Sequence, residues 1–542
     1  MTLNRGKILV IDDLPDWRAM VGGLLQDAGY DVQTAADASQ AMHLLRQQPY
    51  HVAVVDMRLD EEDEHNKEGL ILAEQMKTYA PELAILVLTA HADIPAVKRA
   101  LQPREDGLRV AFDFIEKHEI AKLLPSVENA FLNGVKVNPQ LDIKLDPTLS
   151  WSQLQENIEC LQPLETEEAR LEITDLLQRI FHEAERVEIK SMNNGHSSGS
   201  VVLITPMMRN IIQTDVVVKF NEREKAERES RNYDRYVGNF VGGARRTQRL
   251  DFRATAKLGG IAYSFVGAEA REFQRLSRLY ASEDVETIRV VIDNLFRETC
   301  HTWYTNTLTS NQYPQSLSVA YQTWLRLDGA KIMTALKKII EQTKMSHLAF
   351  SDPRRPGQSD ILFSERGVRL VNPLPLSRLA LVYNGLYAFS HGDLHEGNIL
   401  VDSHHETWLI DFYHTGPGHP VRDFAMLESA IKFSLQQSTC SLSILYDWER
   451  SLHRVTTLTA EPTSDPPLQL DAELMKATKL ILHLRSLIDQ ILPAMTLRDY
   501  QISLYFHALK GMTLPSKLSE RQRVHALISA SLLAEILSPV ST

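Results

Sequence analysis

Residues 391–400, HGDLHEGNIL, place side chains that could do chemistry directly before an apolar run. Residues 399–411 have the pattern of two short apolar strands around a turn, which predicts a β-hairpin. Asn398 lies just before the first strand and Asp411 just after the second, so the two side chains should meet at the open end of the hairpin. An amide oxygen and a carboxylate there suit Mg²⁺ and nucleotide phosphates, and Asp393 could accept a hydroxyl proton beside them.

A nucleotide-binding lobe would have to precede this hairpin, and the chain offers its parts in the required order. A strand lysine, Lys219, is costly unless it meets an anion, and the helix after it offers Glu229 as partner, with Glu227 as second choice. A glycine and serine loop would let backbone amides approach phosphates. Alone, such a loop is more often a plain turn. Its candidate phosphate contacts are Gly195, Ser197, Ser198 and Gly199.

The first 130 residues alternate five apolar strands with helices, which predicts a doubly wound parallel sheet covered on both faces. In such sheets the functional groups lie at the carboxyl ends of the strands. Acidic residues there would repel one another unless a cation such as Mg²⁺ lay among them, and a hydroxyl and a lysine could bind a phosphoryl group. The residues at these ends are Asp12, Asp13, Asp56, Thr89 and Lys117.

Composition limits the class of protein. A length of 542 residues predicts several domains, and 44% hydrophobic with 24% charged residues is typical of a soluble globular protein. The net charge of -12 argues against a broad nucleic-acid-binding surface. We find no signal-peptide pattern, no apolar run long enough to span a membrane and no helix-turn-helix, so we expect a cytoplasmic protein without nucleic-acid or membrane partners.

Residues 5–130 resemble the receiver domain of bacterial response regulators. The resemblance implies that Asp56 accepts a phosphoryl group from a cognate histidine kinase. Two features depart from the pattern: the loop 58–69 is longer and more acidic than usual, and His118 replaces a proline. The residues with implied roles in metal binding, phosphate contact or switching are Asp12, Asp13, Asp56, Arg58 through its carbonyl, Thr89, Lys117 and Phe114.

Residues 187–425 resemble the protein-kinase-like fold, and the motifs HGDLHEGNIL and LIDF are most similar to its aminoglycoside and choline phosphotransferase branch. Tyr413 replaces the glycine of the protein-kinase Asp-Phe-Gly motif. The resemblance implies an α+β N-lobe over 187–267 and a largely helical C-lobe over 268–542. The implied residues are Asp393 as base, Asn398 and Asp411 as Mg²⁺ ligands, Lys219 with Glu229 on the ATP phosphates, Phe265 and Val266 at the adenine, and Asp423 supporting the loop or capping a helix.

Residues 131–186 are predicted as a helical connector between the receiver (1–130) and the kinase-like region. Its apolar stripe could pack on the next domain, or couple or dimerise the protein. We therefore predict a response regulator whose phosphorylated receiver controls an ATP- and Mg²⁺-dependent phosphotransferase acting on an alcohol group of an unknown small molecule or protein. The alternative is a pseudokinase scaffold that binds nucleotide and a protein partner.

Overall fold

The computed structural model divides into two compact units, which are described separately. The first comprises Met1–Ser230, Gln248–Ser264 and Glu269–Arg271, and the second comprises Arg231–Thr247, Phe265–Ala268 and Glu272–Thr542. The structure describes residues 5–59, 68–90, 102, 109–191, 200–238, 240, 247–265, 273–308, 316–342, 347–464 and 467–538.

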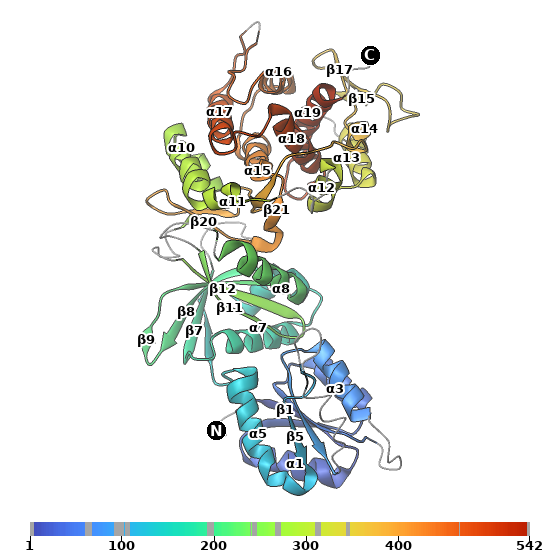
Figure 1. The fold of residues 1–542 in the computed structure, drawn as a ribbon, viewed down its shortest axis with the longest axis vertical. Coiled ribbons are helices and arrows are strands. Elements are labelled where there is room, and N and C mark those ends of the chain that lie inside the picture. The colour runs from blue at the N-terminus through green and yellow to red at the C-terminus, as the bar shows by residue number, and fades with distance from the viewer. Residues whose placement is uncertain are drawn as a thin grey trace. The chain divides into compact units, whose positions relative to one another are not determined.

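The first unit begins with a five-stranded parallel sheet in the order β2-β1-β3-β4-β5 (Figure 1). Along β1, Ile8 and Val10 pack towards α1 and α5, whereas Leu9 and Ile11 pack towards α2 and α3. The inner strands β1, β3 and β4 thus bury both faces, which confirms the predicted doubly wound receiver domain. The elements are β1 Lys7–Ile11, α1 Pro15–Asp27, β2 Asp31–Ala35, α2 Ala38–Gln47, β3 Val52–Asp56, α3 Glu68–Tyr79, β4 Ala84–Thr89, β5 Asp113–Glu116 and α5 Leu123–Asn129.

A second, seven-stranded sheet follows in the order β11-β12-β10-β8-β7-β6, with β9 paired to β8. Helices α6 and α7 precede β7, and α8 follows β10. The elements are β6 Asp142–Leu145, α6 Trp151–Asn157, α7 Thr166–Ile180, β7 Arg186–Ser191, β8 Val201–Met208, β9 Ile211–Ile212, β10 Val216–Glu222, α8 Arg223–Asn232, β11 Thr247–Ala254 and β12 Leu258–Phe265.

The segment 131–186 is not purely helical, unlike the connector predicted from the sequence. It contributes β6, which pairs in parallel with β7, because the backbone of Asp142–Leu145 can extend the sheet at its edge. Its apolar stripe is part of the core: Leu176, Ile180 and Ala184 are buried against strands of the sheet. This burial favours the packing alternative for the stripe over a dimer helix.

A buried polar contact joins the receiver to α7 within the first unit. The Lys7 amide donates to His51 Nδ1 at 3.0 Å, so the ring proton is on Nε2. Nε2 lies 2.7 Å from Asp175 Oδ1 and donates to it, while Arg179 Nε donates to Asp175 Oδ2 at 2.8 Å. His51, Asp175 and Arg179 are all buried, so this contact belongs to the core of the unit.

The His51 contact should make stability depend on pH. Burial lowers the pKa of His51 below 6.5, so the unfolded chain binds this proton more readily than the folded chain. The contribution is present above pH 6.5 and is lost as the pH falls through the lowered folded pKa. The His51→Gln variant should therefore lose less thermal stability than the wild type between about pH 8 and about pH 5.

Differential scanning calorimetry of both proteins at both pH values measures this difference. The comparison with the variant is needed because a second buried group also changes stability with pH. Burial raises the pKa of Glu172 to about 7, so protonation of Glu172 stabilises the folded protein as the pH falls. Equal pH slopes in wild type and variant would contradict the role given to His51.

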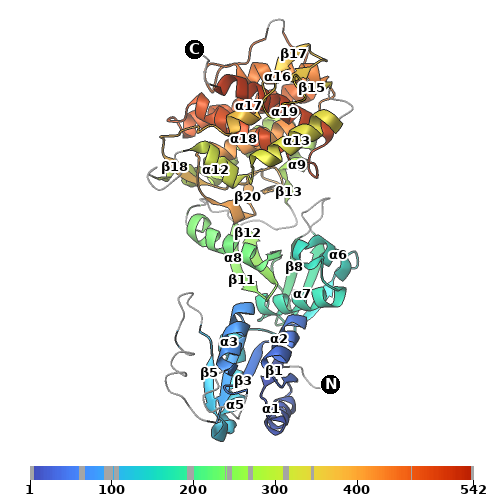
Figure 2. The same cartoon turned by 90° about the vertical axis from the view of Figure 1, so that its right-hand side faces the viewer.

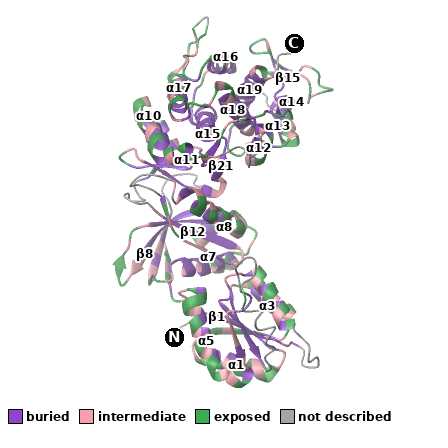
Figure 3. Cartoon of the chain, viewed as in Figure 1, coloured by how far each residue is buried: buried purple, intermediate pink, exposed green. Residues whose placement is uncertain are grey.

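The second unit is largely helical and carries three small three-stranded sheets. Helix α18 packs along α19 and α16 lies against α19 (Figure 2), while α15 packs against α18. The purple colouring in Figure 3 marks strand β1 and most of α18 and α19 as buried. Among the described residues, no helix has both the length and the apolar character needed to cross a membrane.

The elements of the second unit run as follows: β13 Gln274–Arg275, α9 Leu276–Ser282, α10 Val285–Asp293, α11 His301–Thr305, β14 Thr307–Leu308, α12 Leu317–Trp324, α13 Gly329–Gln342, β15 Leu348–Phe350, β16 Ile361–Phe363, β17 Val368–Leu370, α14 Leu374–Ser377, β18 Tyr387–Ser390, β19 Ile399–Val401, β20 Thr407–Leu409, β21 Gly416–Gly418, α15 Arg422–Ala430, α16 Leu442–His453, α17 Ala472–Ile491, α18 Leu497–Met512 and α19 Glu520–Leu537.

Candidate functional site

Three carboxylates and a lysine converge at the carboxyl edge of the receiver sheet. Asp12 and Asp13 follow β1 and Asp56 ends β3, and one carboxylate oxygen from each lies within 4.8 Å of the others. Lys117 Nζ lies 2.7 Å from Asp56 Oδ2 and 2.9 Å from Asp12 Oδ2. Residues far apart in the sequence meet here because parallel strands bring their carboxyl ends to one edge.

This cluster fits a magnesium ion. Asp13 Oδ1 is buried without a hydrogen-bond partner, and carboxylate oxygens are the ligands that Mg²⁺ prefers. Burial raises the pKa of Asp56 to about 6, with Lys117 acting in the opposite direction. A bound divalent cation would favour the ionised carboxylates and supply positive charge beside a phosphoryl group on Asp56.

The other residues predicted for the receiver lie close to this edge of the sheet. Thr89 ends β4 and is buried. The Arg58 amide donates to Asp56 Oδ1 at 3.4 Å, so the backbone turns back over the carboxylate. Phe114 lies in β5, partly buried against the receiver core. The structure thus brings Asp12, Asp13, Asp56 and Lys117 into contact and places Thr89 at the end of the neighbouring strand.

Two supporting contacts at this edge were missed in the sequence. The Trp17 ring centroid lies 4.9 Å from Lys117 Nζ, a cation–π distance. Arg18 donates to the carbonyls of Asp12 and Asp13 at 2.6 and 2.8 Å. Both residues are on α1, where helical spacing alone gives no sign that they turn back toward the strand end.

The second sheet of the first unit holds a buried ion pair. Lys219 Nζ in β10 lies 2.6 Å from Glu229 Oε2 in α8, and the Tyr263 hydroxyl donates to Glu229 Oε1 at 3.0 Å. Glu227, the second choice from the sequence, instead pairs with Arg223 at 2.9 Å. A lysine positioned by a buried carboxylate can present its charge to the phosphates of a nucleotide.

The predicted nucleotide contacts around this pair are only partly described. Phe265 is the last residue of β12. Five predicted residues lie outside the described residues: Gly195, Ser197, Ser198, Gly199 and Val266.

In the second unit, β19 and β20 form an antiparallel hairpin at the predicted place. Asn398 precedes β19, and the Ile410 amide donates to its carbonyl at 3.2 Å. The Asn398 side-chain amide donates to the Asp393 carbonyl at 2.9 Å, which leaves its side-chain oxygen as the group that could bind a cation. Asp411 has a φ of 71°, a left-handed conformation rare outside glycine that the surrounding structure must hold.

Asp423 anchors the start of the same loop. Its carboxylate accepts hydrogen bonds from the amides of His391 at 2.8 Å and Gly392 at 2.9 Å, and from the Tyr304 hydroxyl at 3.0 Å. Its neighbour Arg422 donates to the Gly392 carbonyl at 2.6 Å. Asp423 is buried in the first turn of α15 but does not cap that helix. Of the two roles considered for it, the contacts are those of loop support.

Two further residues near the hairpin were missed in the sequence. Burial lowers the pKa of His414 to about 4, although Asp393 and Asp411 act in the opposite direction, so a neutral ring lies near both carboxylates. Asn232 donates to the carbonyls of the two residues after Asp411, at 3.2 and 2.8 Å. Neither residue stands in a motif, so only their position in space reveals the contact.

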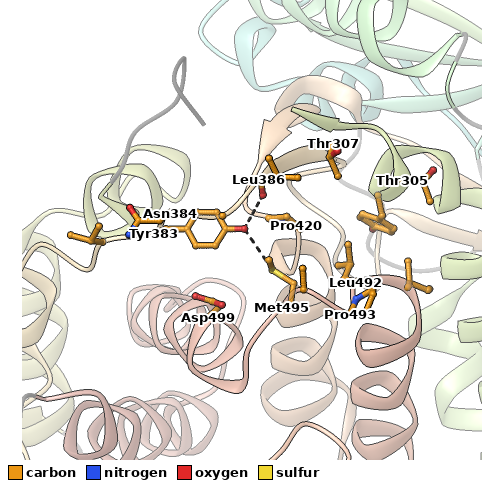
Figure 4. A pocket seen from close by; sticks show the side chains of 15 residues that line it. Thr305, Thr307, Tyr383, Asn384, Leu386, Pro420, Leu492, Pro493, Met495 and Asp499 are labelled. Carbon is orange, nitrogen blue, oxygen red and sulfur yellow. Dashed lines mark hydrogen bonds between the residues drawn. The ribbon is translucent and has the colours of Figure 1, made fainter. Parts of the chain in front are cut away.

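A pocket of about 590 Å³ opens elsewhere in the second unit (Figure 4). Its wall contains residues 491–495, which run from the end of α17 toward α18, and residues 382–386, and most of these side chains are apolar. The Tyr383 hydroxyl donates to the Leu386 carbonyl at 2.8 Å. Tyr304, which helps to anchor the 391–400 loop, also lines the pocket. None of the sequence-predicted site residues is among the described residues that line it.

Comparison with known families identifies most of the chain. The sequence model of a family described as ternary complex associated domain 9 (TCAD9) matches residues 184–325 and 357–513, more than half of the chain. The chain belongs to the TCAD9 family. In this TCAD9 protein the matched residues include Lys219, Glu229, Asp393, Asn398 and Asp411, so these five residues predicted from the sequence all lie in the family region.

The TCAD9 protein also contains a response regulator receiver domain, matched over residues 8–127, which confirms the prediction for the N-terminal region. It is 35% identical over 99 residues to the alginate biosynthesis transcriptional regulatory protein AlgB of Pseudomonas putida, which covers 18% of this chain and 21% of AlgB. It is 32% identical over 110 residues to the nitrogen assimilation regulatory protein NtrX of Azorhizobium caulinodans, which covers 20% of this chain and 22% of NtrX.

The chain thus spans about a fifth of the length of the curated relatives it matches. Among solved structures, the receiver domain of NtrX from Brucella abortus is 29% identical with a TM-score of 0.20, covering 23% of this chain and 98% of that chain.

Proposed function

We propose that this TCAD9 protein is a response regulator in which a histidine kinase phosphorylates Asp56, and that the phosphorylated receiver controls an ATP- and Mg²⁺-dependent phosphotransferase. The acceptor is an alcohol group on a small molecule or a protein. The receiver half of the proposal is supported by the family match over residues 8–127 and by the carboxylate cluster around Asp56.

The observation that carries the phosphotransferase half is the anchored loop that ends at Asn398. At the start of the loop, the Asp423 carboxylate accepts hydrogen bonds from two backbone amides. At the end of the loop, the Asn398 side chain donates to the Asp393 carbonyl. A loop held at both ends keeps the Asp393 carboxylate in one place, which proton transfer in a phosphoryl-transfer site requires.

In the proposed reaction the acceptor hydroxyl oxygen bonds to the γ-phosphorus of ATP as the bond to the β-phosphate oxygen breaks and ADP leaves. The hydroxyl proton passes to the Asp393 carboxylate. Asn398 and Asp411 have the oxygen groups to hold Mg²⁺, which would neutralise phosphate charge. Lys219, positioned by Glu229 at 2.6 Å, would contact the α- and β-phosphates.

A second candidate is the pseudokinase scaffold. The family description refers to association with a ternary complex, and this wording favours a partner-binding role. In that case the protein would bind ATP without requiring Mg²⁺, and no phosphoryl group would be transferred from it.

Phosphorylation of the receiver should change the rate at which the full-length protein turns over Mg–ATP. The Asp56→Asn variant should take up no phosphate from acetyl phosphate and should show no change in turnover when the donor is added, because the amide cannot form the acyl phosphate. Phosphate uptake is measured by a mobility shift on a phosphate-binding gel, and turnover by ADP release.

The matched control is Asp27→Asn, an exposed aspartate at the end of α1 in the same domain. It should respond to acetyl phosphate as the wild type does. Labelling of Asp56→Asn would defeat the assignment of the phosphorylation site. Turnover unaffected by a fully labelled receiver would defeat the proposed control.

A further inference from the structure

A short segment between α12 and α13 is tied to the candidate catalytic loop within the second unit. The Arg422 guanidinium carbon lies 4.7 Å from the centroid of the Trp324 ring. The same guanidinium donates to the carbonyl of Gly392, the residue before Asp393. The backbone after Trp324 is therefore fixed relative to the proposed base.

Three cations gather on this segment, and we name Arg326, Lys331 and Lys510 the basic shelf. Lys510 Nζ in α18 donates to the Leu325 carbonyl at 3.0 Å, and Lys331 Nζ in α13 donates to the Arg326 carbonyl at 3.0 Å. Arg326 donates from Nη2 to the Tyr413 hydroxyl at 3.4 Å. Neutral oxygens thus hold all three cations in place while their charge is retained.

Little negative charge from the protein neutralises the basic shelf. Asp328 lies 4.0 Å from Lys331, but both side chains are 58% exposed, and such a surface pair contributes little. Among the described residues, Asp393 forms no ion pair with any of the three cations. Desolvation lowers the pKa of Lys510, and Asp393 acts in the opposite direction, which places the lysine within electrostatic reach of the proposed base.

We propose that the phosphoryl acceptor is an anionic alcohol, one that carries a phosphate or carboxylate group, and that the basic shelf binds this group while its hydroxyl lies at Asp393. The inference rests on the proposed phosphotransferase function. The bond changes are those given above: the acceptor oxygen bonds to the γ-phosphorus, ADP leaves, and the proton passes to Asp393.

The positive charge of the basic shelf should favour negatively charged acceptors over positively charged ones. An anionic group placed on Arg326 and Lys510 gains charge-assisted hydrogen bonds, whereas an ammonium group there meets like charge. The competing reading is that the cations act on the transferred phosphoryl group itself. That reading predicts no preference for the charge of the acceptor.

The test is calorimetric titration of the full-length protein saturated with Mg²⁺ and a non-hydrolysable ATP analogue. The probes are glycerol 3-phosphate, glycerol and choline, which differ in charge. Glycerol 3-phosphate should bind more tightly than the other two. The double variant Arg326→Gln/Lys510→Gln should weaken that binding at least about tenfold, as expected for the loss of two charged contacts. Lys338→Gln, an exposed lysine of α13 outside the basic shelf, should leave it unchanged.

The same titration without nucleotide distinguishes a failure of the proposed ATP site from a failure of the proposed acceptor site on the basic shelf. If the ATP analogue does not bind, the proposed function fails, and the binding of glycerol 3-phosphate to the nucleotide-free protein still tests the basic shelf. Absence of glycerol 3-phosphate binding, tighter binding of choline, or full affinity in the double variant would each overturn the anionic-acceptor proposal.

Discussion

Replacing Asp393 with asparagine should lower the rate of Mg–ATP turnover by about 10²- to 10⁴-fold, the range typical for removal of a general base. The amide has nearly the same shape but cannot take the proton from the attacking oxygen. The loop should keep its conformation, because its anchoring bonds use the Asp393 carbonyl and the Asp423 carboxylate rather than the Asp393 side chain. ATP affinity should therefore be unchanged.

The measurement is ADP release with water as acceptor, which requires no knowledge of the natural acceptor. Glu396→Gln is the matched control, since this carboxylate lies three residues away in the same loop and accepts a hydrogen bond from Ser434 at 2.5 Å that glutamine can also accept. It should turn over ATP at the wild-type rate. Turnover by Asp393→Asn at the rate of the control would remove Asp393 from the mechanism.

Replacing Glu449 with alanine should cost about 3–5 kcal/mol of stability in the second unit, the range for breaking a buried ion pair from one side. Glu449 lies in α16 and is completely buried. Its carboxylate lies 2.7 Å from Lys432 Nζ and 2.8 Å from both His453 Nε2 and His525 Nε2. Without it, the buried lysine charge would lose its nearest carboxylate.

Helices distant in the sequence meet at this carboxylate, so the loss should affect the whole helical core. Glu535→Ala is the matched control, because Glu535 pairs with Arg454 at 3.1 Å with nearly half of each side chain exposed. Such a pair contributes about 0–1 kcal/mol. Both costs are measured by urea unfolding. A cost for Glu449→Ala no larger than that of the control would show that the buried network does not stabilise the fold.

The receiver could be predicted in detail because its site follows from local rules. Apolar strands, helices between them and polar residues at the strand ends together specify a parallel sheet with one functional edge. That logic predicts Asp12, Asp13, Asp56 and Lys117 from the sequence, and the structure brings the four together. The Lys219–Glu229 pair could be predicted for the same reason, because the two residues lie only ten positions apart, on a strand and on the helix that follows it.

The remaining contacts had no local signal. Tyr304 reaches Asp423 across 119 residues of sequence, and Lys510 reaches Leu325 across 185. A buried tyrosine or a half-buried lysine on a helix has the same pattern whether it supports a catalytic loop or only fills the core. The edge strand β6 escaped prediction because tertiary pairing, rather than the composition of residues 142–145, makes that segment a strand.

The most direct test of the central claim, that the TCAD9 region is an Mg²⁺-dependent ATP site, is the affinity of the full-length protein for ATP by calorimetry. It is measured with and without Mg²⁺ on the wild type and on Asp411→Asn. We predict binding that requires Mg²⁺ in the wild type and is weakened at least about tenfold in the variant. Absence of ATP binding by folded protein, with the receiver either free or phosphorylated, or binding that is indifferent to both Mg²⁺ and Asp411, would contradict the account.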